Sequence, residues 1–94
     1  MDIPYHPPVK RSLAIHGHRT SISLEPIFWD LLKRAASEEG VALAALVARI
    51  DAERIQAETP PGLAGALRVW LAVRIIDDSS SEAVSDDSIR EIEQ

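Results

Sequence analysis

The sequence predicts a mainly α fold with one short β-strand per chain, a ribbon completed by a second copy of the chain, and an added C-terminal helix. Thr20 to Leu24 alternate small polar and apolar residues, which is the period-two pattern of a half-buried strand. Helical patterning starts directly behind this strand, stops at Gly40 and starts again near Leu43. Because a strand of about six residues cannot stand alone, we expect the strands of two copies to pair antiparallel about a two-fold axis.

This order of elements, with RTSISL before the first helix and a glycine between the two helices, resembles the ribbon-helix-helix repressors of the Arc/MetJ type. It is similar to the small bacterial members in which a third helix follows the motif. The resemblance covers roughly residues 18–55. It implies a homodimer whose intersubunit antiparallel ribbon enters the major groove of double-stranded DNA. The protein is therefore expected to be a transcriptional repressor, and several dimers could assemble side by side on DNA.

Length and composition indicate a single domain in the cytoplasm. A chain of 94 residues buries a modest core, so dimerisation is expected on size alone. The absence of cysteine excludes a disulfide framework, a thiol nucleophile and a thiolate metal site, and it suits a reducing compartment. The first ten residues lack the apolar core of a signal peptide, and no apolar run approaches the roughly 20 residues of a membrane span.

The charge is unevenly distributed along the chain. The net charge is −5, but residues 77–94 hold seven acids against Arg90 and so carry −6, which leaves +1 for residues 1–76. Around the predicted strand, Lys10, Arg11 and Arg19 are opposed by Glu25 alone. DNA affinity follows such local charge. Residues 77–94 are predicted to be an acidic, disordered tail, which could also dock a protein partner or compete with DNA.

The chain before the strand is predicted to be an irregular arm over residues 1–11, followed by the folded unit over residues 12–76. Ser12 to His16 alternate again, and Gly17 permits a bulge or a tight turn because glycine tolerates positive φ. This second short strand either folds back as a hairpin or lengthens the ribbon, and the sequence does not choose between the two.

The first helix is predicted from Pro26 to Glu39. Proline suits the first turn of a helix, and Gly40 ends the helix as a left-handed cap. Trp29 lies off the apolar stripe of this helix, so we expect it near a subunit boundary. The stripe itself consists of Ile27, Phe28, Leu31, Leu32 and Ala35.

The second helix is predicted from about Leu43 to Ala57, with Leu43, Leu46, Val47, Ile50 and the stem of Arg54 on its inner side. The resemblance implies that this helix forms much of the dimer core. We assign that core to Ile22, Leu24, Leu46 and Ile50.

The third helix is predicted from Leu63 to Ile76, after a break at Thr59-Pro60-Pro61-Gly62. Arg68 and Arg74 are its only charged residues, and a helix that is apolar nearly all round is buried. Its inward residues are predicted to be Leu67, Trp70 and Leu71.

Arg19, Ser21 and Ser23 share one face of the predicted strand and are the candidate base-reading residues. The major groove admits a two-stranded ribbon, Arg suits guanine O6 and N7, and Ser can donate or accept. A merely solvated strand face is the plainer alternative.

Phosphate contacts are expected from Lys10, Arg11 and the backbone at Ala42 and Leu43, where the second helix starts. Such repressors usually carry Ser or Thr there, whereas this chain has Ala42, Ala44 and Ala45, so a hydroxyl contribution is missing.

No cofactor, metal site or enzymatic activity is expected. His16 and His18 flank Gly17, with His6 upstream, but no acid or cysteine lies beside them to complete a metal site. No nucleophile, base and orienting group can be assembled either.

Two rival functions remain open. One is an antitoxin that wraps a toxin with its C-terminal segment. The other is a dimeric protein-interaction module that has lost DNA binding, which the alanines and the negative net charge favour.

Overall fold

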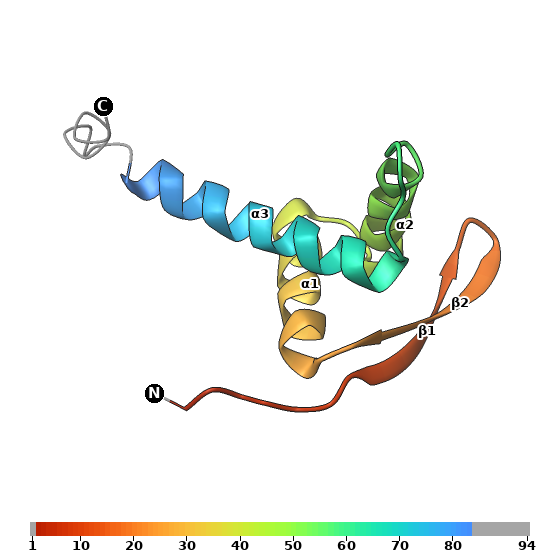
Figure 1. Cartoon of the computed structure of the whole chain (residues 1–94), viewed down its shortest axis with the longest axis horizontal. Coiled ribbons are helices and arrows are strands. Elements are labelled where there is room, and N and C mark those ends of the chain that lie inside the picture. The colour runs from red at the N-terminus through yellow and green to blue at the C-terminus, as the bar shows by residue number, and fades with distance from the viewer. Residues whose placement is uncertain (1, 84–94) are drawn as a thin grey trace.

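The computed structural model describes residues 2–83, which form one antiparallel β-hairpin and three helices (Figure 1). The hairpin reaches out on one side of the helices, and α3 runs across α1 and α2 towards the opposite side (Figure 1). The elements are β1 (Val9–Ile15), β2 (His18–Leu24), α1 (Pro26–Glu39), α2 (Leu43–Arg54) and α3 (Leu63–Ala83).

A single chain supplies both strands of the ribbon. The strands are joined by His16 and Gly17, and the ladder between them begins at the pair of Ile15 with His18. His16 and Gly17 both have positive φ, 53° and 80°. A two-residue turn with this backbone geometry matches the right-handed twist of the two strands that it joins. The prediction of one strand per chain is therefore wrong. The sequence did not decide whether Ser12 to His16 fold back or lengthen the ribbon. In the structure they belong to a hairpin whose first strand already starts at Val9.

A hydrophobic core closes within this one chain. The four residues assigned to the dimer core are only 0–3% exposed, because the hairpin, α1 and α3 of the same chain cover them. Burial of these four residues therefore does not require a second copy of the chain. The buried apolar residues of the described chain are Ile15, Ile22, Leu24, Trp29, Leu32, Ala35, Ala36, Leu46, Val47, Ile50, Leu67 and Leu71.

Trp29 lies inside this core rather than near a boundary. Its side chain is 1% exposed, and its indole N–H donates a hydrogen bond of 2.9 Å to the carbonyl of Val9 in β1. The expectation of a boundary position is wrong because β1, for which the sequence indicated only the segment Ser12 to His16, starts at Val9, folds back as a hairpin and covers this ring. Ile27, predicted to lie on the apolar stripe, is instead 44% exposed.

The limits of the helices follow local signals. Both ends predicted for α1 are confirmed, and Gly40 closes that helix in the left-handed conformation with φ 71°. α2 ends at Arg54, three residues before the predicted end. No proline or glycine stops α3 at Ile76, and the helix continues to Ala83, into the segment predicted as a tail. The rest of that tail, residues 84–94, lies outside the described residues. Among the three helices described, none contains an apolar stretch of the length that a membrane span requires.

Ion pairs with α1 and the residue before it hold α3 in place. Arg68 donates two hydrogen bonds, of 3.2 and 3.0 Å, to the Oε1 atom of Glu25. Arg74 donates to Glu39 at 2.7 Å and to Glu38 at 2.8 Å. Both arginines of the apolar part of α3 are thereby directed towards the rest of the chain.

The carboxylates in these pairs are expected to make the stability of the fold depend on pH in the acid range. Hydrogen bonds from its own backbone and from Arg68 lower the pKa of Glu25 below its ordinary value of 4.5. A hydrogen bond from Arg49, joined by one from Arg74, lowers the pKa of Glu39. A lowered pKa stabilises the fold fully above 4.5, and this contribution is lost as the pH falls through the lowered value.

We therefore expect the urea concentration at the midpoint of unfolding to fall as the pH drops below 4.5. Replacing both acids, Glu25→Gln with Glu39→Gln, should flatten the dependence of the midpoint on pH. An equally steep dependence in the double variant would assign the acid sensitivity to other carboxylates.

Candidate nucleic-acid interface

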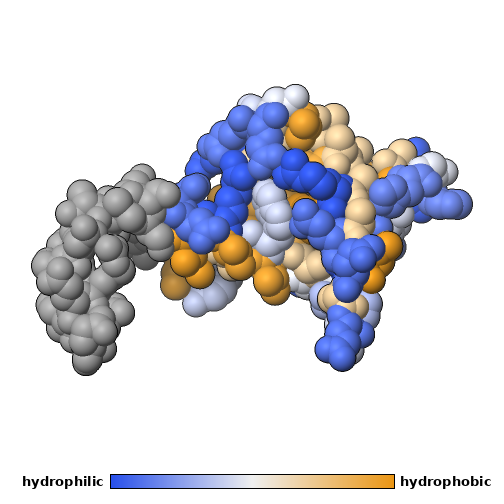
Figure 2. All heavy atoms as spheres, turned by 90° about the horizontal axis from the view of Figure 1, so that it is seen from above, coloured by the Kyte–Doolittle hydropathy of each residue, from blue (hydrophilic) through white to orange (hydrophobic). Residues whose placement is uncertain are grey.

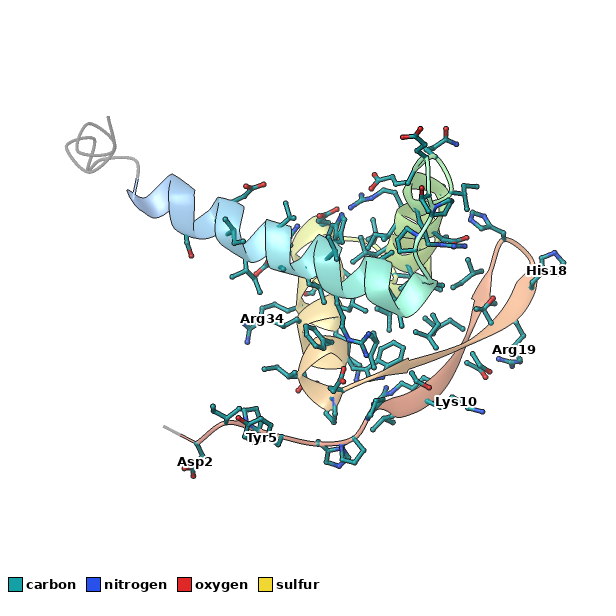
Figure 3. The ribbon with its side chains drawn as sticks, viewed as in Figure 1. Asp2, Tyr5, Lys10, His18, Arg19 and Arg34 are labelled. Carbon is teal, nitrogen blue, oxygen red and sulfur yellow. The ribbon has the colours of Figure 1, made fainter. Side chains whose placement is uncertain are left out.

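The face of the hairpin turned away from the helices is a continuous polar surface, which we call the outer ribbon face. Cross-strand pairing places two side chains side by side at each of three levels along this face. In Figure 3, Lys10 and Arg19 both extend away from the helices. The outer ribbon face consists of the pairs Lys10–Ser23, Ser12–Ser21 and Ala14–Arg19, and all six residues are exposed.

The chemistry of the outer ribbon face suits an anionic, grooved partner. It carries two positive charges, three hydroxyl groups and one methyl group, with neither an acid nor a large apolar side chain among its six residues. The hydroxyls of Ser12 and Ser21 lie 3.4 Å apart at its centre. A two-stranded ribbon fits the major groove of B-DNA, where a guanidinium can pair with guanine and hydroxyls can donate or accept.

The opposite face of the hairpin packs on the helices, and it contains one of the predicted phosphate contacts. Arg11 lies on this inner face with its guanidinium 5.4 Å from the centre of the Trp29 ring, which is the geometry of a cation–π contact. Lys10 and Arg11 therefore point to opposite sides of the ribbon. The structure brings Lys10 together with Arg19, Ser21 and Ser23 and leaves Arg11 out.

The start of α2 belongs to a separate element and is not part of the outer ribbon face. Ala42, the residue that precedes the helix, is exposed and extended, and no side chain caps the helix there. Leu43 is half-buried. The first N–H groups of any helix lack partners within that helix, so this terminus offers backbone donors without a hydroxyl.

The histidines lie at the hairpin turn and in the N-terminal arm rather than in a cluster. His16 places Nε2 3.6 Å from Oδ2 of Asp51 in α2, and His18 starts β2. Within residues 2–83, no group of three or more His, Cys, Asp or Glu side chains is placed to hold a metal ion.

Sequence reasoning missed two of the six residues of the outer ribbon face, Ser12 and Ala14, together with their pairing to β2. The signal was present in the alternation on both sides of Gly17. Only the two-residue turn fixes the register that sets Ser12 against Ser21 and Ala14 against Arg19.

Comparison with known proteins gives one match. A family model described as a ribbon-helix-helix domain matches residues 8–75, which include both strands, α1, α2 and the first part of α3. No curated protein and no solved structure gives a match.

Proposed function

Because the chain belongs to the ribbon-helix-helix domain family, we propose that it is a sequence-specific DNA-binding protein that acts as a homodimeric transcriptional repressor. The resemblance found in residues 18–55 extends in the family match to β1 and into α3. The family is one of DNA-binding transcription regulators and is not an enzyme family.

The observation that carries this proposal is the outer ribbon face. Arg19, Ser21 and Ser23 would read base edges in the major groove, while Lys10 on the neighbouring strand would contact a phosphate. The backbone N–H groups at Ala42 and Leu43 would add a second phosphate contact. In a two-fold dimer, each chain would present its own hairpin to one half of a symmetric operator.

Replacing Arg19 tests the proposal. Arg19→Ala should weaken binding to the cognate operator by about 1–3 kcal/mol and relax the base preference at one position, as expected for loss of a bidentate contact to guanine. Fluorescence anisotropy against a panel of operator variants measures both effects. The thermal melting temperature should barely change, because Arg19 is exposed.

Arg34→Ala is the matched control. Arg34 is an exposed residue of α1 that points away from the hairpin, and its replacement removes the same charge (Figure 3). Equal losses in the two variants would mean that Arg19 acts only through net charge. An operator preference that survives Arg19→Ala would place base reading elsewhere.

A protein-interaction module is the second candidate function. The uncapped start of α2 and the apolar side chains exposed on α3 favour it. An electrophoretic mobility shift with DNA from upstream of the protein's own gene separates the two functions. A shift at micromolar protein supports the repressor, and its absence supports the module.

A further inference from the structure

Among the six residues of the outer ribbon face, Ala14 is the one whose side chain carries no polar atom. It is exposed, and it lies across the two strands from Arg19, at the level nearest the hairpin turn. In Figure 2 the tip of the hairpin, at the end of the molecule away from the grey residues, is mostly hydrophilic. The methyl group of Ala14 is therefore an isolated apolar point on a polar surface.

The composition of the outer ribbon face allows its backbone to come close to a bound duplex. Four of its six residues are serine or alanine, whose side chains extend at most one heavy atom beyond Cβ. The two long side chains, Lys10 and Arg19, lie on different strands and at opposite ends of the face. A methyl group as short as that of Ala14 touches a base edge only when the backbone lies deep in the groove, and the small neighbouring residues permit that depth.

The cross-strand pairing of Ala14 with Arg19 determines where the methyl group would lie on the DNA. Side chains directly opposite each other on two antiparallel strands have Cβ atoms about 4.5–5.5 Å apart. Successive base pairs of B-DNA are separated by about 3.4 Å. When the Arg19 guanidinium pairs with O6 and N7 of a guanine, the Ala14 methyl group therefore lies within about two base pairs of that guanine.

A methyl group selects a base in a different way from a hydroxyl group. The hydroxyls of Ser21 and Ser23 can donate or accept a hydrogen bond, so several bases satisfy them. In the major groove, thymine alone presents a methyl group, whereas cytosine and adenine present amino donors and guanine presents acceptors. An alanine methyl group placed against one of those polar groups would displace its water without replacing the hydrogen bond, which is unfavourable. Thymine is therefore the base that Ala14 fits.

We propose that Ala14 is a further specificity-determining residue, which contacts the C5 methyl group of a thymine within about two base pairs of the guanine that Arg19 reads. This contact rests on the proposed function, because it requires the outer ribbon face to lie in the major groove. It assigns base reading to both strands of the hairpin, with Ala14 in β1 and Arg19 in β2. Each half of the operator then contains a guanine with a thymine close to it.

Removing the methyl group from the DNA tests this contact while the protein stays unchanged. The probe is the duplex of highest affinity that the full chain selects from a randomised pool. Deoxyuridine pairs as thymidine does but lacks the C5 methyl group, so each thymine of the probe is replaced by it in turn. At the thymine that meets Ala14, replacement in one half-site should raise the Kd by about threefold to fivefold, the effect of exposing one buried methyl group. Fluorescence anisotropy measures each Kd.

Substitutions at Ala14 assign the effect to this residue. Ala14→Gly removes the methyl group and should bind the probe and its deoxyuridine form with equal Kd. Ala14→Thr restores a methyl group on a residue that suits a strand, so it should keep a preference for the thymine form. Ser12→Ala is the matched control on the same strand and should keep the full wild-type difference. Because each comparison is a ratio of two Kd values for one protein, a general loss of affinity in a variant cancels.

The outcomes separate this contact from the proposed DNA binding. A selected duplex in which no thymine is sensitive to loss of its methyl group, or a sensitivity that Ala14→Gly retains, overturns the contact while sequence-specific binding stands. Ala14 would then only leave room for Arg19. A sensitive thymine more than about two base pairs from the guanine whose preference Arg19→Ala relaxes also overturns the contact. Failure to select any sequence from the pool overturns the proposed function itself, and the contact with it.

Discussion

Replacing Trp29 with alanine is expected to lower the free energy of unfolding by about 3–5 kcal/mol, the usual loss for a fully buried aromatic side chain. Trp29 is 1% exposed and joins α1 to β1 through its hydrogen bond to Val9. Its loss would open a cavity and leave the Val9 carbonyl without this donor. Urea unfolding followed by circular dichroism measures the change.

Two further variants separate the causes of that loss. Trp29→Phe keeps most of the ring and removes the donor, so it should cost about 1–3 kcal/mol. Trp70→Ala removes the same side chain from a half-buried position on α3 and should cost less than Trp29→Ala. Losses of similar size at Trp29 and Trp70 would contradict the burial described for the two rings.

Replacing Ser21 with glutamate is expected to weaken DNA binding by at least about a hundredfold. Ser21 lies at the centre of the outer ribbon face, beside Ser12, and a carboxylate there would meet the phosphates and acceptor-rich base edges of the major groove. Like charges held together at an interface cost several kcal/mol. Anisotropy titrations at two salt concentrations measure the loss.

Ser37→Glu provides the control, because it introduces the same charge at an exposed position of α1 away from the hairpin. It should weaken binding little, through the change in net charge alone. Nearly unaltered DNA affinity in Ser21→Glu would show that the outer ribbon face does not enter the groove.

Features set by neighbouring residues could be predicted from the sequence. Proline at the start of α1 and Gly40 at its end determine both limits of that helix. The alternation from Thr20 to Leu24 determines which side chains of β2 face the core and which face outward. Three of the six residues of the outer ribbon face were identified in this way.

Features that depend on distant contacts could not be predicted in the same way. The position of Trp29 depends on β1, which covers the ring only because His16 and Gly17 turn the chain back. The nearly unbroken hydrophobicity of α3 correctly placed Leu67 and Leu71 in the core. It could not show that Val69 and Ile76 would lie outside a core that the hairpin had already helped to fill.

The turn at His16 and Gly17 also affects when the two-stranded ribbon forms during folding. A hairpin closes over a short stretch of chain, on a timescale of about 1–10 μs and at a rate independent of protein concentration. A ribbon shared between subunits forms only after two chains have met. This chain completes its two-stranded element during its own folding, so a newly synthesised copy carries the proposed reading surface before any encounter with a second copy.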